Sequence, residues 1–431
     1  MDKIFFKYGL DDTPPIMECI LLGLQWLAIV VPIVIIIGKV VSGLRFDNPA
    51  DQIVYIQKLF FVSGASMLVQ VLWGHRLPLI MGPATVLLVG VVASRGSNIN
   101  AVYSAVIIGG VILSALSITG LFGYLKKLFT PRVIATMLIM IAFTLTPMII
   151  NLITTATVQV DQLSNLLFAL VFVLLLFIAN KHLTGIWKAT LIIWSIIAGS
   201  MFYFFLYPQP VGAGAGDGFP ISAAFLGKSY AHFTVEPGIL ISFLVCFMAL
   251  SINDLGSIQS LAELIRPDHM EKRITRGISI TSLFNVISGF LGIIGPVNFS
   301  LSPGVIASTG IASRFTLIPA ALGLLLLSFL PKAISFLGSI PPVVIGTSLI
   351  YIMCSQIAAG LQTALNSMRS FKVEYGLVMG LPLMLSIIIS FLPANILSTF
   401  PALLRPVIGN GFVVGVLSVL FMEHIIYREK D

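Results

Sequence analysis

Long apolar runs separated by short polar connections occupy almost the whole chain. A helix that crosses a membrane needs about 20 apolar residues, because the hydrocarbon core of a bilayer is about 30 Å thick. Twelve runs predict full membrane-spanning helices, near residues 16–38, 52–73, 101–125, 131–153, 163–180, 186–207, 236–264, 274–294, 316–336, 341–361, 374–393 and 405–426. The pattern therefore predicts an all-α polytopic membrane protein.

Two further apolar stretches, 77–94 and 297–313, are shorter and contain a Gly-Pro or Pro-Gly pair. Irregular backbone at membrane depth is tolerated only where protein covers it or where it lines a cavity. A simple proline kink is the alternative for either stretch alone. Each stretch is third in its half of the chain, however, and interrupted segments at matching positions indicate the binding site of a transporter. We therefore expect a polar site at mid-membrane, built from free backbone groups and half-helix N-termini.

The two interrupted stretches bring the predicted count to fourteen segments, seven in residues 1–207 and seven in 236–431. The glycine-rich stretch 208–235 is the longest connection and is predicted to be an external linker. With a cytoplasmic N-terminus, seventeen of the 24 lysines and arginines fall on the cytoplasmic side and seven outside. This asymmetry follows the positive-inside rule and predicts that both termini are cytoplasmic.

Composition narrows the class of protein further. Hydrophobic residues make up 58% of the chain and charged residues 10%, whereas a soluble domain carries about 25% charged residues. The net charge of +7 is spread over short loops, so it predicts topology and not nucleic-acid binding. The sequence contains no H-E-x-x-H motif and no P-loop. We therefore expect neither an enzyme nor an ATP-driven pump, and no cofactor or metal.

Polar residues interrupt the eighth predicted span, in the run A-L-S-I-N-D-L-G-S-I-Q-S-L at 249–261. Asp254 lies near the centre of this span, where a carboxylate costs about 2.5–3.5 kcal/mol on insertion scales and normally faces a cavity or a partner. One interpretation makes Asp254 the coupling residue, which takes up and releases a proton or binds sodium. The alternative is a structural carboxylate that bonds a nearby helix end or hydroxyl and never titrates.

Asn253 and Ser257 are four residues apart and so share one face of this helix, which Ser260 continues. The amide of Asn253 carries donors and an acceptor, which match the hydrogen-bonding edge of a base. A hydrogen bond between helices is the alternative for Asn253.

The segment G-V-I-A-S-T-G-I-A-S-R at 304–314 resembles the signature Q-N-x-G-x-x-x-x-T-x-x-x-S-R of the nucleobase–ascorbate transporter family, the xanthine/uracil permeases. Gly304, Thr309, Ser313 and Arg314 fall on its fixed positions. Further similarities lie along the chain in order: L-G-L-Q-W-L at 22–27, M-G-P-A-T at 81–85, A-S-R-G at 93–96, F-T-P at 129–131, S-I-P-P-V-V-I-G at 339–346 and R-P-V-I-G-N-G at 405–411. The overall pattern is most similar to the purine permease branch of the family.

The resemblance implies two inverted seven-segment repeats. Segments 1–4 and 8–11 would form a core domain, and segments 5–7 and 12–14 a gate domain. Substrate would lie between short strands in segments 3 and 10, facing segment 8. The family is typified by proton- or sodium-coupled uptake of bases across the cytoplasmic membrane, and by homodimers formed through the gate domains.

The chain also departs from the family pattern at several positions. Leu301 and Ser302 stand where the signature has Gln or Glu and Asn, and Asn253 stands at the base-binding Glu of segment 8. Thr85 lies where relatives place an aromatic that stacks on the base, so Trp26 or Phe299 would have to substitute. The residues expected to line the substrate site are Gln25, Thr85, Asn253, Ser257, Phe299, Ser300, Leu301 and Ser302. Arg314 is expected to anchor a cytoplasmic helix end, with gating as the alternative.

The leading hypothesis is a secondary active transporter that takes up a purine or related nucleobase with protons, in contact with membrane lipid. An anion transporter of the same architecture, carrying sulfate or bicarbonate, is the second hypothesis. The neutral Asn253 favours an anion, and Asp254 argues against one. An uncoupled facilitator is the third hypothesis, because only one acidic residue lies near a span centre.

Overall fold

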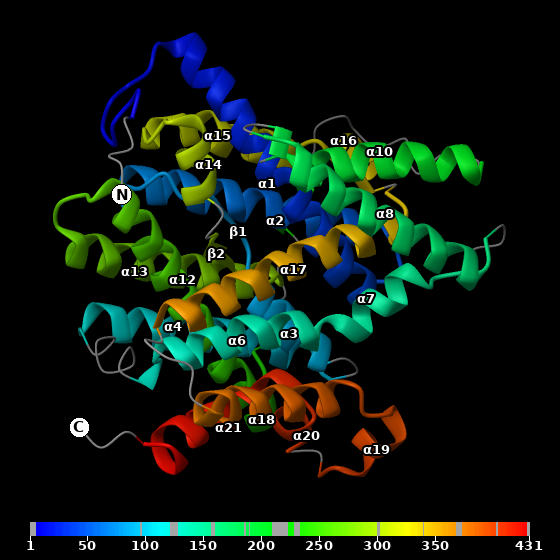
Figure 1. The fold of residues 1–431 in the computed structure, drawn as a ribbon. Helices are drawn as coiled ribbons and strands as arrows, with labels where there is room; N and C mark the ends of the chain where they lie inside the picture. The colour runs from blue at the N-terminus through cyan, green and yellow to red at the C-terminus, as the bar shows by residue number, and fades with distance from the viewer. Residues whose placement is uncertain are drawn as a thin grey trace.

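The computed structural model describes residues 6–94, 97–120, 128–156, 160–184, 187–188, 190–208, 223–227, 233–299, 302–338, 340–367, 373–401 and 404–428. Within these residues, nine helices are long and apolar enough to cross a membrane, or ten if one bent pair counts as a span. The long helices (Figure 1) are α1 (Ile16–Arg45), α2 (Pro49–Leu72), α4 (Ile99–Ile118), α6 with α7 (Pro131–Thr144, Thr146–Ile153), α8 (Gln162–His182), α12 (Pro237–Ile265), α13 (Met270–Leu291), α17 (Pro342–Ser367) and α18 (Val373–Ser390).

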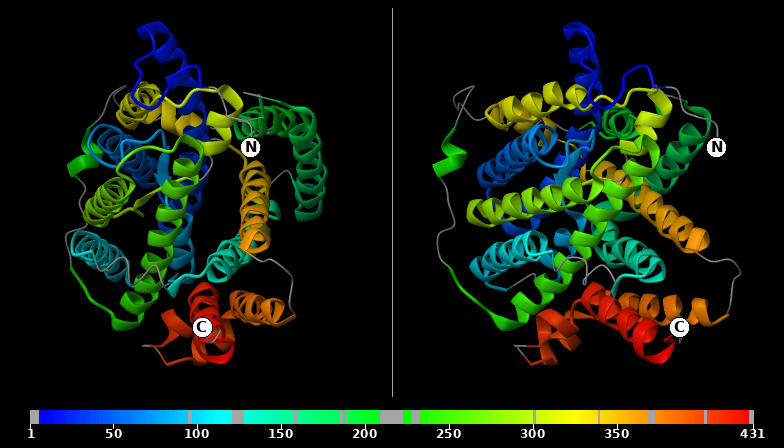
Figure 2. Two further views of the ribbon diagram at one scale, coloured as in Figure 1. Left: turned by 60° about the vertical axis from the view of Figure 1, so that its left-hand side comes forward. Right: turned by 90° about the vertical axis from the view of Figure 1, so that its left-hand side faces the viewer.

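Shorter elements complete the described chain. They are α10 (Leu191–Leu206), α11 (Ala224–Gly227), α19 (Ala394–Thr399), α20 (Arg405–Ile408), α21 (Gly411–Phe421) and the π-helical turn η2 (Met422–Ile426). The C-terminal helices α18 to α21 lie together at one end of the molecule (Figure 2), where α18 and α21 pack on α6. Most of the predicted external linker, 209–222 and 228–232, lies outside the described residues.

Prolines divide two of the predicted spans in the structure. The span predicted at 131–153 divides into α6 and α7, because Pro147 has no N–H to donate to the preceding turn. The span predicted at 316–336 divides into η1 with α15 (Arg314–Thr316, Leu317–Ser328) and α16 (Pro331–Gly338), which meet at 97°. Pro331 begins α16, where the missing proline N–H is least costly.

The two interrupted segments meet as a two-stranded antiparallel sheet. Strand β1 (Met81–Pro83) leads into α3 (Thr85–Ala93), and β2 (Pro296–Asn298) precedes α14 (Ser302–Thr309). The register pairs Met81 with Asn298 and Pro83 with Pro296. This confirms the short strands expected in the third and tenth segments, and it joins the two halves of the chain near the middle of the molecule (Figure 1).

The helices that precede the strands, α2 and α13, hold each other's ends. The Lys58 ammonium of α2 donates to the Leu291 carbonyl at the end of α13, at 2.7 Å. In return, Arg273 Nη1 of α13 donates to the carbonyls of His75 and Arg76 just beyond α2, both at 3.0 Å. Lys58 is one of the seven cations that the topology count places on the external side, and the structure buries it inside α2 instead of in a loop. Its charge is satisfied by a helix C-terminus, which attracts cations.

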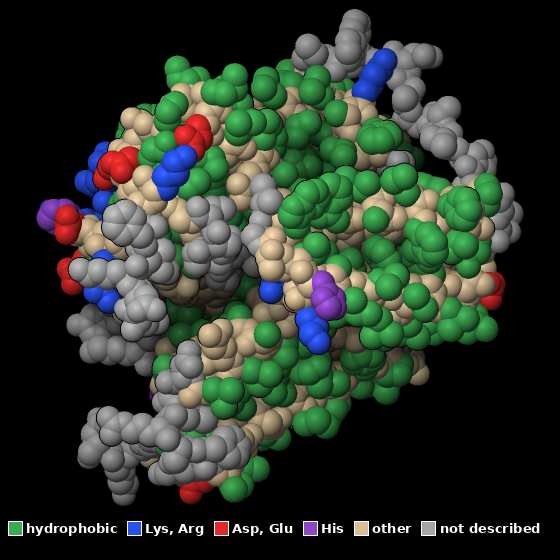
Figure 3. Space-filling model, turned by 45° about the horizontal axis from the view of Figure 1, so that its top comes forward, with side chains coloured by type: hydrophobic (Ala, Val, Ile, Leu, Met, Phe, Trp, Pro, Cys, Tyr) green, Lys and Arg blue, Asp and Glu red, His purple; other side chains and the backbone are tan. Residues whose placement is uncertain are grey.

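The surface suits a lipid environment. Figure 3 shows hydrophobic side chains over much of the visible face and most of the charged ones gathered toward one side. Exposed large apolar residues are concentrated on α8 and α10, and they include Leu170, Leu174, Met201, Phe202 and Phe205. A soluble protein rarely exposes so large a contiguous apolar patch.

Candidate functional site

Some backbone groups of strand β2 do not bond to β1, and side chains of α12 bind them instead. The flanking hydrogen bonds run from Phe299 N–H to Ile80 O and from Ala84 N–H to Gly295 O, both at 2.9 Å. The pair between Met81 and Asn298 therefore falls at a non-hydrogen-bonded position of the ladder, where backbone groups point away from the partner strand.

Two side chains of α12 bind these backbone groups of Asn298. Asp254 Oδ1 accepts the Asn298 N–H at 3.0 Å. The Ser257 hydroxyl donates to the Asn298 carbonyl, also at 3.0 Å. Because 254 and 257 are three residues apart on a helix, both side chains reach the same strand residue.

The side chain of Asn298 is bound as completely as its backbone. Its Nδ2 donates to Asp254 Oδ1 at 2.7 Å, and its Oδ1 lies 3.1 Å from His75 Nε2. Asn298, Asp254 and His75 are all fully buried. All four polar groups of Asn298 thus have partners, as buried polar groups require.

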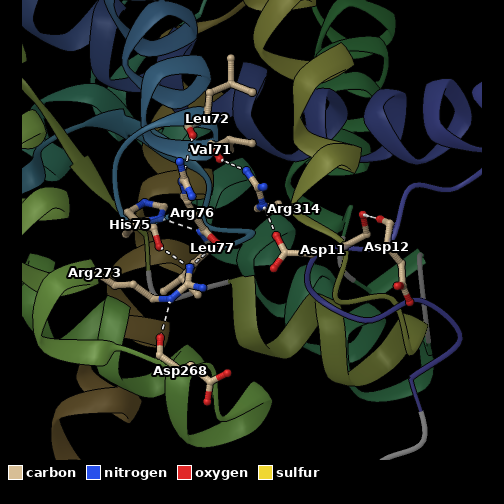
Figure 4. Close-up of polar contacts among 11 residues, drawn as sticks. Asp11, Asp12, Val71, Leu72, His75, Arg76, Leu77, Asp268, Arg273 and Arg314 are labelled. Carbon is tan, nitrogen blue, oxygen red and sulfur yellow. Dashed lines mark hydrogen bonds and ion pairs between the residues drawn. The ribbon is translucent and has the colours of Figure 1, made fainter.

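His75, in the turn between α2 and β1, was not singled out by the sequence. Its Nδ1 accepts the Leu77 N–H at 2.9 Å, so in the neutral ring Nε2 carries the proton and donates to Asn298. Burial lowers the pKa of His75 to about 4, with a further lowering from the Arg273 charge. Gln70 Oε1 accepts the His75 N–H at 3.2 Å and fixes the turn. Figure 4 shows this turn with Arg273 against its carbonyls.

The two oxygens of Asp254 differ in their hydrogen bonding. Oδ1 accepts both bonds from Asn298. Among the residues that the structure describes, Oδ2 has no hydrogen bond of normal geometry, although Thr281 of α13 lies close to the carboxylate. A buried carboxylate oxygen with no donor is open to a proton or a cation.

A different strip of α12 is left open by the protein. Asn253 is half-buried, and Gly256 and Ser260 are exposed. A β-carbon at Gly256 would meet no atom within 4 Å. Ser257, in contrast, is turned into β2, and its hydroxyl oxygen also lies 2.9 Å from the Asn253 carbonyl, so its one proton is shared between that carbonyl and the carbonyl of Asn298. The open strip is small and polar in the middle of an apolar helix.

The other predicted substrate-site residues lie around the strands. The half-buried Phe299 packs its ring over Gly82, where a β-carbon would come within 2.7 Å of the ring. Thr85 is the first residue of α3 and is half-buried. Ser302 is buried, and its hydroxyl accepts the Ile80 N–H at 3.0 Å.

Four further predicted residues receive no description of their side chains. Ser300 and Leu301 lie outside the described residues. Gly304 and Thr309 lie in α14, where the structure describes the helical backbone alone.

Gln25 of α1 is half-buried, and its Nε2 is enclosed without a hydrogen-bond partner among the described residues. Its neighbour Trp26 is buried, and the indole N–H donates to Thr316 Oγ1 at 3.0 Å. Trp26 is therefore held at a helix contact, and the enclosed amide of Gln25 is a donor that a ligand could use.

Arg314 lies at the far end of the second interrupted segment, in the polar cluster of Figure 4. Its Nη1 donates to the Val71 carbonyl at 2.6 Å, and its Nε pairs with Asp11 Oδ1 at 2.7 Å. Asp11 belongs to an N-terminal stretch that runs beside 310–314, with a bridge between Tyr8 and Ile311. Arg314 thus ties three parts of the chain together.

No group of three or more His, Cys, Asp or Glu side chains that could hold a metal ion occurs in the described part of the chain. The polar chemistry of this region is therefore that of one carboxylate, amides, hydroxyls and a neutral imidazole.

Comparisons with known proteins show the family and the fold of the chain. A family model described as the Permease family, named for xanthine and uracil permeases, matches residues 17–395. The xanthine permease of Bacillus subtilis is 25% identical over 93% of this chain and 90% of its own. The nucleobase transporter PlUacP of Paenibacillus larvae is 24% identical over 92% and 91%. Among solved structures, the transmembrane domain of a cyanobacterial bicarbonate transporter, BicA, matches with a TM-score of 0.62 and 16% identity, over 89% of this chain and 98% of that one. The last likeness is one of fold alone.

Proposed function

The chain belongs to the xanthine/uracil permease family, whose model covers residues 17–395, and on that premise we propose that it is a secondary active transporter that uses protons to take up a purine or related nucleobase across the cytoplasmic membrane. Family membership makes it a multi-pass membrane permease and not a member of an enzyme family. The class of base, the coupling to protons and the direction of transport are the new elements of the proposal.

The observation that carries the coupling is the buried contact between Asp254 and strand β2. An ionised Asp254 accepts two charge-assisted hydrogen bonds from Asn298, one from the backbone and one from the amide. A proton on the free oxygen Oδ2 would neutralise the carboxylate and weaken both bonds. The position of β2 against α12 would then depend on protonation, which is how a proton gradient could drive a change in the substrate site.

The substrate would lie beside the strands, against the open strip of α12. The amide of Asn253 can donate to and accept from the edge of a base. Gly256 leaves room for a flat ring to approach the helix, and the half-buried ring of Phe299 packs over Gly82 of β1. The enclosed Nε2 of Gln25 is a further donor. The names of the xanthine and nucleobase relatives support a base as the substrate class.

The proposal includes an architecture of fourteen segments in two inverted repeats, 1–207 and 236–431, with both termini cytoplasmic. Segments 1–4 and 8–11 would form the core, and 5–7 and 12–14 the gate. The reciprocal caps between α2 and α13 support the inversion, because each helix performs for the other the same task in the opposite direction. The exposed apolar face of α8 and α10 supports contact with lipid or with a second copy of the gate.

The experiment is uptake of radiolabelled uracil, xanthine, hypoxanthine, guanine, adenine, urate and sulfate into proteoliposomes, with an imposed pH gradient and with it collapsed. We expect one base to accumulate and the accumulation to vanish with the pH gradient. Accumulation driven by a sodium gradient alone would mean that Asp254 binds sodium in place of a proton. Movement of sulfate without any base, or equal flux with no gradient, would overturn the proposal in favour of an anion transporter or a facilitator.

A further inference from the structure

A chain of hydrogen bonds leads to Asp254, and every donor in it points the same way. The Leu77 N–H donates to His75 Nδ1, His75 Nε2–H donates to Asn298 Oδ1, and Asn298 Nδ2–H donates to Asp254 Oδ1. The chain starts on a backbone amide, which has only one donor and cannot reverse. Its direction is therefore set at the end farthest from the carboxylate.

The amide of Asn298 has two orientations available to it, and His75 selects one. If the amide were reversed, its NH₂ group would face the His75 N–H and its carbonyl would face the Asp254 carboxylate. Two donors would then face each other at His75 and two acceptors at Asp254. Each contact would leave a buried group unsatisfied. With His75 in place, only the orientation that offers NH₂ to Asp254 satisfies all three side chains.

We propose that His75 is a positioning residue for ion coupling: it fixes the amide of Asn298 so that the NH₂ group always faces Asp254. This inference rests on the proposed function of Asp254 and names the residue that regulates it. His75 lies 223 positions from Asn298 in the chain and contributes from the turn after α2.

His75 performs this task without carrying a proton itself. Its Nδ1 is occupied by the Leu77 N–H, so a proton at Nδ1 would place two donors against each other. The charged groups that face the turn are Arg273 from α13, bonded to the His75 carbonyl, and Arg76 in the turn itself. Both are cations and oppose a charge on the imidazole. From α12, Asp254 reaches His75 only through Asn298.

The direct consequence concerns the ionised form of Asp254. Without His75, the Asn298 amide is free to rotate and to offer its carbonyl to Asp254. A carbonyl favours the protonated carboxyl group and disfavours the carboxylate. Loss of His75 is therefore expected to keep Asp254 protonated up to a higher pH, while substrate contacts on the open strip of α12 stay intact.

The test compares His75→Leu, which removes the donor, with His75→Gln, which keeps an N–H near the position of Nε2 and does not titrate. Arg76→Gln in the same turn is the matched control, because among the described residues its side chain donates to the Leu72 carbonyl and not to His75, Asn298 or Asp254. The full-length chain is labelled with ¹³C-aspartate in lipid, and the carboxyl band that disappears in Asp254→Asn is followed by infrared spectroscopy as the pH is varied.

We expect His75→Leu to move the pH at which this band appears upward by about one unit, the size of one charge-assisted hydrogen bond. His75→Gln and Arg76→Gln should stay near the wild-type pH. Equal shifts in His75→Leu and His75→Gln, or no shift in either, would overturn the proposal. If His75→Leu does not fold, His75→Gln is compared with Asn298→Leu, which offers no NH₂ group and adds no charge; the proposal requires a shift in Asn298→Leu and none in His75→Gln.

The infrared titration needs no transported base, so it separates this inference from the proposed function. A shift in the band without any base accumulation would retain the role of His75 and reject nucleobase uptake. Base accumulation with an unshifted band would retain nucleobase uptake and reject the role of His75.

Discussion

The two interrupted segments share a backbone plan and differ in chemistry. Each is a three-residue strand that follows a long helix and leads to a short one, and each preceding helix has its end held by a cation from the other. At one end of the register, however, Met81 of β1 faces Asn298 of β2. The methionine is apolar, whereas all four polar groups of the asparagine are bound to α12 and to His75.

The neighbouring helices differ in the same sense. Helix α12 contacts β2 and binds it through Asp254 and Ser257. Helix α1 contacts β1 and carries Gln25, whose Nε2 has no hydrogen-bond partner among the described residues. The fold thus supplies two similar platforms, the first made of β1 and α3 and the second of β2 and α14. In this sequence the ionisable side chain, Asp254, binds to the second. The first platform serves to pair with it and to hold it in register.

Substitutions at the paired residues Asn298 and Met81 should show the largest difference in uptake between the two platforms. Asn298→Ala removes both side-chain bonds, so His75 Nε2 loses its acceptor and Asp254 keeps only the backbone N–H of residue 298. An unsatisfied buried polar group costs about 1–3 kcal/mol. We expect gradient-driven uptake to fall by about 10- to 100-fold. Met81→Ala at the paired position should change uptake by less than about threefold, because it removes packing alone. Equal losses in the two proteoliposome assays would contradict the asymmetry.

The loss of folding stability in acid should depend on His75, in the turn between α2 and β1. The pKa of His75 is about 4 in the folded protein, against about 6.5 when exposed. The unfolded state therefore binds a proton more readily, and the stability that the neutral His75 contributes is present above pH 6.5 and is lost as pH falls toward 4. The loss is about 3 kcal/mol at the acid end.

The measurement is the difference in melting temperature between pH 7.5 and pH 5 in detergent. His75→Gln should reduce this difference by several degrees, since it removes the titrating ring. An exposed histidine, His182 at the end of α8, provides the control, and His182→Gln should leave the difference unchanged. An unchanged pH dependence in His75→Gln would show that another group governs acid unfolding.

Removing either of the two reciprocal helix caps, Lys58 or Arg273, should destabilise the protein, but not by the same amount. Lys58→Met and Arg273→Met each leave helix-end carbonyls without a charged donor, which costs about 1.5–3 kcal/mol for a buried site. Lys58 is almost fully buried, so its loss should lower the melting temperature more than that of Arg273. Lys181→Met, at an exposed helix end, should have little effect. A reversed order would mean that burial does not decide the strength of these caps.

The smallest effect is expected where β1 meets the aromatic ring of the site. Gly82→Ala would bring a methyl group within 2.7 Å of the Phe299 ring, which must move aside. We expect KM for the transported base to rise by a few fold, about 1 kcal/mol, with little change in melting temperature. Adding Phe299→Leu should relieve the crowding if the displaced ring is the cause. A KM that stays at the wild-type value in Gly82→Ala would remove Phe299 from the substrate site.

Much of this arrangement could be predicted from hydrophobic length and from the glycines and prolines. The long helices and both interrupted segments follow from the pattern, and Asp254 was identified because a carboxylate is costly inside an apolar helix. The strands came from the family resemblance, since three residues are too few to show a strand period. The bend before Pro331 was missed, because a proline at the start of a second helix and one inside a single span have the same local sequence.

Asn298 and His75 show why the rest was hidden. His75 reads as an ordinary loop residue after α2, and Asn298 as one polar residue among several. Their importance arises from contacts 223 and 44 positions apart along the chain, which carry no local periodicity. Lys58 is similar, because its partner is a carbonyl at the end of a distant helix.

The central claim is that Asp254 on the second platform couples transport to protons, and it is tested most directly by Asp254→Asn in proteoliposomes. The amide still meets the strand edge through its oxygen, but it does not take up a proton in the physiological range. Two rates are measured with the base that the wild type transports best: uptake driven by a pH gradient, and exchange of internal for external base with no gradient. We predict that the variant exchanges base at a rate within about tenfold of the wild type and accumulates none. Accumulation by the variant at the wild-type level, abolished when the pH gradient is collapsed, would contradict it.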